Sequence, residues 1–531
     1  MLLPNLVVLG SIAVGLGLMS AANVPFYVIT NALPVILIAI GVADGIHILG
    51  QYYEEVAKTP DASPKDITVR TMTEMWRPVT VTSFTDIAGF LAISFSSFMP
   101  PMKAFGVFAS FGILAALLFS LFTIPAILVL LKPKQSSKIS QAGGSDKFGK
   151  VMSGLGAAVS KNSIPTLVIA SIILVVGILG ALRLQVNEER IRNFKTSEKI
   201  YIADRAINKY LDGTTTLDIV VETDDTEGLF NPDYLKKIEA LQEYIETLPN
   251  VSSTTSIVDY LKQMNRAMNE DRKEFFKLPD KSDLIAQYFL IYSASGDPTD
   301  FEEEIDYDYR LANVRATMNS GLFTDIKKVI IPTQKYVDEK FNEPGLTANL
   351  AGRANVDFHW ISGIKKTHFR GVGLALLAVV IFTSLVFRSL VAGLLTVVPV
   401  SMAVLFIYAV MGYTGIWLGV GTSMFAAIAI GTGVDFAVHT LDRLITLIRD
   451  EKRGIDEAFT MLFPSTGRAL LFNFSALFLG FGVLVTSHVP PLIRFGSLVG
   501  VAALVSFLAS QTVIPALIKV IKPKFLVGEN K

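Results

Sequence analysis

The 531-residue chain contains no cysteine, which excludes disulfide bonds and thiolate metal ligands. It has only five histidines, and their scattered spacing does not fit a zinc site, so we expect no metal and no cofactor. The phosphate-binding pattern Gly-x-x-x-x-Gly-Lys-Ser/Thr is also missing, which argues against an intrinsic ATPase. Because no nucleophile–base set is evident, we expect no enzymatic activity, and we expect no nucleic-acid partner.

Charged residues are scarce and unevenly distributed. They make up 18% of the chain, against 51% hydrophobic residues, and the mean hydropathy is +0.49. The formal net charge of zero is the sum of two opposite parts. Residues 186–360 have 32 acidic and 21 basic side chains, and the rest of the chain has a net charge of +11. An acidic middle between basic, apolar flanks is typical of a chain that straddles a membrane.

Two polar interruptions of apolar sequence are the main candidates for function. Gly-Val-Ala-Asp-Gly-Ile-His contains Asp44 and His47, and Gly-Val-Asp-Phe-Ala-Val-His contains Asp435 and His439. The acid and histidine are three residues apart in the first motif and four in the second, so each pair shares one helix face. A carboxylate within a membrane helix costs about 2.5–3.5 kcal/mol on insertion, which favours a functional role. The alternative is that these groups only hold helices together.

The hydropathy pattern predicts an α-helical polytopic membrane protein with about ten spans. The predicted division, in chain order, is a first transmembrane half of four spans (1–131), a cytoplasmic linker (132–162), a single span (163–185), a soluble domain (186–365), a second transmembrane half of five spans (366–521) and a cytoplasmic tail (522–531).

The segment 186–365 has the patterning of an α+β domain. Asn231 and Pro232 suit the N-cap and first position of a helix, and an apolar stripe of helical spacing follows them. A second helix is expected near residues 325–341. The strand candidates are 214–221, 251–257, 309–316 and 346–352. Their alternation with helices suggests an α+β sandwich, with two βαβ units as one arrangement.

A gapless internal repeat relates the two halves. Residues 84–134 match 474–524, and the shared positions include a Pro-Pro pair, an Ile-Pro-Ala triplet and a closing Lys-Pro-Lys. Two copies of the same topology are a common construction of transporters. Most membrane-flanking Lys and Arg lie in 132–161, 442–468 and the tail, whereas the opposite turns carry no charge. This asymmetry places 186–365 outside the cytoplasm.

The paired Asp/His motifs, the Pro-Pro turns and the Ile-Pro-Ala span ends resemble the resistance-nodulation-division (RND) superfamily. The resemblance covers nearly the whole chain and is strongest to the MMPL-like exporter branch, which is similar to Patched and the sterol-sensing proteins. It implies two halves, each with one span, one extracytoplasmic porter-like domain and five further spans. The first half here has only four spans, so two spans and a first porter domain are expected to be absent. We interpret the chain as a fragment or a late-called start, with completion by a partner as the alternative.

The resemblance also implies a proton relay, formed by Asp435 and Asp44 with His439 and His47 beside them. If the two histidines are matched in the repeat, Asp44 falls opposite Phe436, one residue out of register. Asp435 therefore fits the family pattern better than Asp44 does.

Asp86 is a third acid in an apolar segment, with hydroxyl residues beside it. Its repeat partner is Ala476, so it lies outside the symmetric pair. We interpret it either as a further member of the relay or as a buried hydrogen-bonding residue.

The leading interpretation is a secondary transporter, driven by the proton motive force, that exports hydrophobic or lipid-like molecules. The alternatives are a non-transporting, sterol-sensing-like lipid-binding or regulatory membrane protein, and a truncated inactive fragment of an exporter. The expected partners are the substrate, membrane lipids and protons, and homo-oligomerisation is left open. The expected location is a bacterial-type inner membrane.

Overall fold

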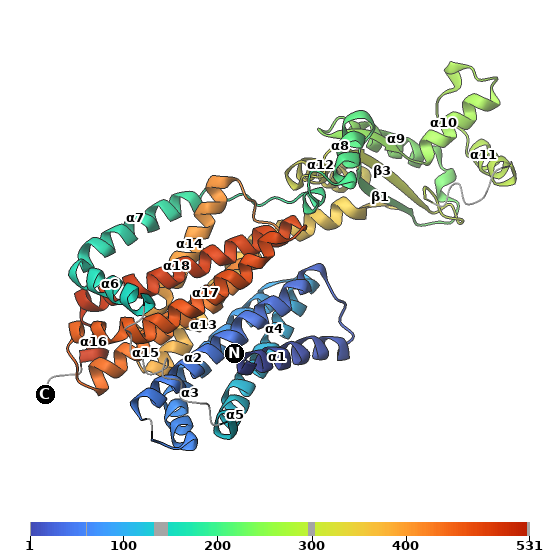
Figure 1. The fold of residues 1–531 in the computed structure, drawn as a ribbon. Coiled ribbons are helices and arrows are strands. Elements are labelled where there is room, and N and C mark those ends of the chain that lie inside the picture. Colours follow the sequence, from blue (N-terminus) through green and yellow to red (C-terminus); the bar gives the residue numbers. More distant parts are fainter. Residues whose placement is uncertain (1, 60, 132–146, 296–302, 528–531) are drawn as a thin grey trace. The chain divides into compact units, whose positions relative to one another are not determined.

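The computed structural model describes residues 2–59, 61–131, 147–295 and 303–527. The chain forms two compact units, one built from Met1–Val186 and Ile364–Lys531 and the other from Asn187–Gly363. In Figure 1 the first unit contains the blue to teal helices α1–α7 and the orange to red helices α14–α18, whereas the second unit is drawn mainly in green to olive.

Ten helical segments of the described chain are long and apolar enough to cross a membrane. They confirm the predicted helical polytopic membrane protein. In chain order the helices that carry these segments are α1 (Leu2–Ala21), α2 (Ala32–Lys58), α3 (Pro64–Ser96), α4 (Pro100–Leu118) with α5 (Ile124–Leu131), α7 (Ser163–Ala181), α13 (Gly352–Phe387), α14 (Leu390–Thr414), α15 (Phe425–Ile445), α16 (Ile455–Leu462) with α17 (Arg468–Gly482), and α18 (Pro490–Ile521).

The helix boundaries repeat together with the sequence. α3 ends at Ser96 before α4 begins at Pro100, and the segment after α17 ends at Thr486 before α18 begins at Pro490. In both places proline occupies the first turn of a helix, where its missing N–H group has no intrahelical partner to lose. The two halves are therefore copies in structure at this connection. They differ further on, because a π turn at Phe119–Thr123 separates α4 from α5 whereas α18 is continuous.

The end of the predicted linker is a packed helix. Residues 132–146 lie outside the described residues, and α6 (Lys147–Lys161) follows them. Its buried residues recur every three or four positions, which gives the helix one face against the bundle. Gly156 lies directly against the ring of Phe463. The described part of the predicted linker is thus a helix with one face packed on the bundle, and not an irregular segment.

The second unit contains a four-stranded antiparallel sheet of order β2-β3-β1-β4. The strands are β1 (Thr215–Thr223), β2 (Val251–Thr255), β3 (Leu311–Met318) and β4 (Leu346–Ala351). Helix α9 (Pro232–Glu246) connects β1 to β2, and α12 (Phe323–Tyr336) connects β3 to β4. Each connection skips one strand, which is the split βαβ arrangement of ferredoxin-like folds. The two expected βαβ units are present in this form.

The α+β unit has its own hydrophobic core. Alternate residues of β1 are buried against the apolar stripe of α9. The Asn231 side chain accepts a hydrogen bond from the Asp233 backbone N–H at 2.9 Å and caps α9, as the sequence predicts. Helices α10 (Ile257–Met268) and α11 (Ser282–Ser295) follow β2 and add to this core.

Candidate functional site

Helix α2 carries Asp44 and His47 into the interior of the helical unit. The side chains share one face, and the residues are only 5% and 6% exposed. α2 is α-helical throughout its length, so no bulge compensates for the register of Asp44. Gly45 lets α1 approach closely, because an added Cβ atom there would lie 2.7 Å from Pro4. The first motif thus combines a polar face with a close helix contact.

Helix α15 carries Asp435 and His439 and is buried over nearly all of its length. The two residues are 5% and 6% exposed, matching their counterparts on α2. Around them α15 packs against α3, α14 and α18. Thr440, on the same helix, accepts a hydrogen bond from the Gln511 amide of α18 at 2.8 Å. The second motif therefore lies on a helix that is surrounded by other helices of the same unit.

The histidines of the two motifs meet. The rings of His47 and His439 are stacked, with centroids 4.0 Å apart and planes inclined by 18°. Asn473 of α17 places its amide nitrogen 3.1 Å from Nε2 of His47. Because an amide N–H only donates, this Nε2 accepts and the ring proton of a neutral His47 is on Nδ1. The two motifs, almost four hundred residues apart in sequence, thus form one side-chain cluster.

Asp86 joins the same region from α3. It is 1% exposed, and its Oδ1 lies against the Cα of Gly431, where a Cβ atom would collide with it. Asp86 interacts electrostatically with Asp44, and Asp435 interacts with both. Each of these three carboxylates has one oxygen without a hydrogen-bond partner among the described residues. The structure therefore brings together all five residues singled out in the sequence.

The cluster lies where helices of the first half pack against helices of the second half. The acid-bearing α15 of the second half packs against α3 of the first, and the acid-bearing α2 packs against α17 of the second. Asn473 matches Ser83 in the sequence repeat, one turn before Asp86. Sequence reasoning missed Asn473, although its repeat position next to the acid-bearing turn was a usable signal.

No described residues form a group of three or more His, Asp or Glu side chains able to hold a metal ion. The cluster itself consists of carboxylates and imidazoles, which can bind and release protons, and of the Asn473 amide, which forms hydrogen bonds only.

Comparison with known proteins agrees with this architecture. The model of the MMPL family matches residues 237–530, more than half of the chain, and the model of the sterol-sensing domain of SREBP cleavage-activation matches residues 1–143. A predicted membrane protein of Methanocaldococcus jannaschii is 23% identical over 305 residues, covering 56% of this chain and 73% of that protein. The apo-petrobactin exporter of Bacillus anthracis is 22% identical over 244 residues, covering 44% of this chain and 32% of the exporter.

Proposed function

The chain belongs to the MMPL family of membrane transporters, and from this premise we propose that it is a proton-driven exporter of hydrophobic or lipid-like molecules. The observation that carries the proposal is the buried cluster of Asp44, Asp86 and Asp435, where the helices of the two halves cross. The similarity to an exporter supports the direction of transport.

Carboxylates buried among apolar helices suit a proton-coupled cycle. Such groups are costly to hold in the charged form, so membrane acids commonly mark proton pathways. A charge that crosses a potential of 100 mV gains about 2.3 kcal/mol. Since 1.4 kcal/mol corresponds to a factor of ten, this energy shifts a two-state equilibrium roughly 50-fold. Proton entry can therefore drive a conformational change of modest cost.

We propose that the helix contacts between the two halves change when a proton binds or leaves. Asp435 and Asp86 lie on α15 and α3, which pack together across the two halves. Loading or releasing a proton there changes the charge at this contact. Since Asp44 is on α2, which packs against α17, the same event acts on the reciprocal contact. In our proposal the two halves then move relative to each other.

The stacked histidines extend the relay beyond the carboxylates. His47 and His439 follow the acids by about one turn on α2 and α15. The amide of Asn473 can present its N–H to a bare Nε2 of His47 or, after rotating, its oxygen to a protonated one. It can thus serve His47 in both states. We propose that His47 and His439 pass protons between the three acids and the end of the helical unit where the Lys- and Arg-rich segments lie.

The proposed location is a bacterial-type inner membrane, with the α+β unit on the extracytoplasmic side. The support is the distribution of Lys and Arg, which concentrate in the segments 132–161 and 442–468 and in the tail. The turns at the opposite ends of the spans carry no charge.

A second candidate function is lipid sensing without transport. The match of residues 1–143 to a sterol-sensing domain favours it. Such a protein would bind a lipid within the bundle and would need no proton gradient. The buried acids shared between the halves favour transport over this candidate.

The test is the accumulation of the hydrophobic dye Nile red in cells that express the chain, with and without a protonophore. We expect expression to lower accumulation and the protonophore to remove the difference. An effect of expression that survives the protonophore would exclude proton coupling. Sterol binding by the purified protein with unchanged dye accumulation would favour the sensing candidate.

A further inference from the structure

Helix α8 (Lys199–Tyr210) of the α+β unit, labelled in Figure 1, exposes its apolar side. Ala203, Ala206 and Tyr210 follow Ile202 by one, four and eight positions, so these four residues share one helix face. All four are exposed, Ile202 to 56% and Tyr210 to 73%. A surface helix normally packs such an apolar face on the core. In α8 the arrangement is reversed, and no residue of the helix is buried.

The polar side of α8 holds the helix in this rotation. The Thr214 hydroxyl, just before β1, donates to Oδ1 of Asp204 at 2.7 Å, and its backbone N–H donates to Oδ1 of Asn208 at 3.1 Å. The Arg205 guanidinium donates to Oε1 of Glu189 at 2.8 Å, and the Glu189 side chain is only 4% exposed. The helix is therefore attached to the unit through its polar residues, which keeps the apolar face outward.

Apolar residues at both ends of α8 are exposed as well. Ile200 in its first turn is 51% exposed, and Leu211 directly after the helix is 68% exposed. Among the described residues, the hydrophobic core of the α+β unit includes neither of these side chains and none from α8. Contiguous apolar surface that a soluble domain leaves exposed marks an interaction site.

The charge of this segment differs from that of the rest of the unit. Residues 187–211 contain six basic and four acidic side chains, a net charge of +2, whereas residues 212–360 contain 15 basic and 28 acidic side chains, a net charge of −13. Lys199 and Lys209 lie at the two ends of α8. A lysine stem can lie along apolar surface while its ammonium group reaches a phosphate. Anionic lipid headgroups therefore attract this segment and repel the remainder of the unit.

The position of α8 in the chain also favours a lipid surface. Only residues 182–198 separate it from α7, which is long and apolar enough to cross a membrane. The chain therefore leaves the membrane shortly before it forms α8. A second copy of the chain is a poorer partner, because a two-fold contact between α8 helices would bring two positively charged segments together.

We propose that the apolar face of α8 docks on the surface of a membrane that contains anionic lipids, with Ile202 and Tyr210 inserted between the headgroups and Lys199 and Lys209 at the phosphates. Helices that lie in the membrane interface combine these two features, an apolar face and Lys or Arg beside it. The proposal goes beyond the proposed function, because it concerns a lipid contact of the α+β unit and neither proton coupling nor the substrate.

The absence of cysteine allows a single fluorescent label to be placed in the full chain. Ile202→Cys puts the label on the apolar face of α8. Met268→Cys, at the end of α10 in the same unit, is the matched control, because Met268 is 53% exposed against 56% for Ile202. Tyr210→Cys provides a second label position on the apolar face.

The experiment is quenching of the dye NBD by doxyl-labelled lipids, in the purified full chain reconstituted into nanodiscs of phosphatidylglycerol or of phosphatidylcholine. We expect quenching at position 202 in phosphatidylglycerol, weaker quenching in phosphatidylcholine, and none at position 268. Adding Lys199→Gln to the Ile202→Cys chain should lower the ratio of docked to undocked label about fivefold, the contribution of one lysine near an anionic surface. Lys335→Gln should leave this ratio unchanged, because that side chain is 70% exposed on α12, away from α8 in the sequence.

Equal signals at positions 202 and 268 would overturn the proposal, as would equal quenching in the two lipids. A disulfide-linked dimer of the Ile202→Cys chain, together with an unquenched label, would show that a second copy covers the face, which also overturns it. If Ile202→Cys is unstable, Tyr210→Cys decides by the same criteria. The measurement needs neither a proton gradient nor a substrate. Failure of docking therefore leaves the proposed function standing, and failure of export leaves the docking standing.

Discussion

The two transmembrane halves share a scaffold but divide the polar groups unequally. Both contain a buried acid and a histidine on equivalent helices, α2 and α15. On the following helix the first half has Ser83 and Asp86, where the second has Asn473 and Ala476. The repeat therefore explains how the helices pack, whereas the differences within it show where the halves do different work. The first half supplies two of the three clustered acids, and the second supplies the amide that holds the histidine.

The strongest test of this division is the loss of one acid from the more deeply buried helix. Asp435→Asn removes the buried carboxylate of α15 and replaces it with an amide of nearly the same shape. We expect dye export to fall to the level of cells that lack the protein, whereas Asp44→Asn should impair export less. The measurement is dye accumulation at matched expression, with and without a protonophore. Asp450→Asn is the control, because that carboxylate is 53% exposed. Wild-type export by Asp435→Asn would end the relay hypothesis.

The next effect comes from the contact between the halves at Gly431. A methyl group there would collide with Oδ1 of Asp86, so Gly431→Ala must displace the acid or separate α3 from α15. We expect a large loss of export and a lower free energy of unfolding, by about 1–3 kcal/mol. Gly480→Ala is the matched control, since it meets no atom within 4 Å. If the two variants exported equally well, the position of Asp86 would not matter for transport.

The same contrast shows how far the sequence could predict the site. The repeat and the apolar runs were sufficient for the helical architecture, because span length and the placement of prolines are local properties. The motifs likewise predicted Asp44, His47, Asp435 and His439. The stacking of the histidines could not be predicted, because it depends on how helices from different halves are rotated against each other.

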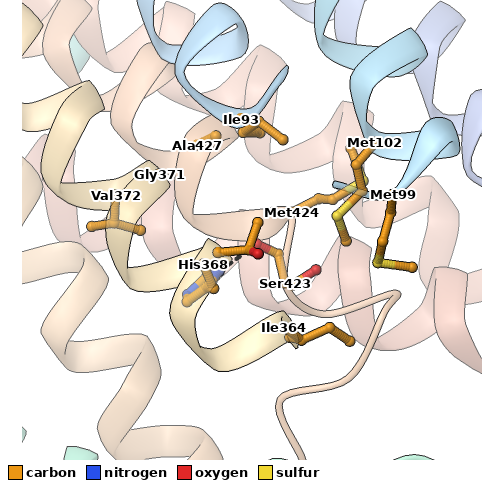
Figure 2. Close-up of a pocket in the computed structure, with 11 residues that line it drawn as sticks. Ile93, Met99, Met102, Ile364, His368, Gly371, Val372, Ser423, Met424 and Ala427 are labelled. Carbon is orange, nitrogen blue, oxygen red and sulfur yellow. Dashed lines mark hydrogen bonds between the residues drawn. The ribbon is translucent and has the colours of Figure 1, made fainter. Parts of the chain in front are cut away.

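Asn473 and the contacts of His368 were missed for a related reason. An asparagine in an apolar helix has many uses. The repeat position of Asn473 beside the acid-bearing turn marks it, but only its 3.1 Å approach to His47 identifies its partner. His368 belongs to neither of the two motifs and lies in the sequence just after the acidic segment. Its ring nitrogens contact the backbone oxygen of Ser423, in the turn before α15 (Figure 2), and the hydroxyl of Tyr408 on α14. Long-range contacts of single side chains leave no periodic signal in a sequence.

A smaller effect is expected when Asn473 is made like its repeat partner. Asn473→Ser shortens the side chain and removes the bond to His47 Nε2, while keeping a polar group at the site. A buried hydrogen bond contributes about 1 kcal/mol, so we expect export to fall severalfold with little change in stability. Adding Ser83→Asn to the Asn473→Ser variant moves the amide to the repeat-related position on α3. It tests whether an amide there restores export. Full export by Asn473→Ser would show that the amide is only a packing group.

The smallest effect should come from an asymmetry at the end of the second half. There Lys519 of α18 contacts Asp456 and the Ser160 hydroxyl of α6, and Lys519 corresponds to Val129 in the repeat. The Asp456 side chain is 69% exposed, and ion pairs that exposed contribute about 0–1 kcal/mol. Lys519→Ala should therefore lower the unfolding temperature only slightly and leave export unchanged. Thermal unfolding and dye accumulation measured on the same preparations check this. A loss of export as large as that of Gly431→Ala would mean that the contact of α6 with the second half matters for transport as much as the buried acids do.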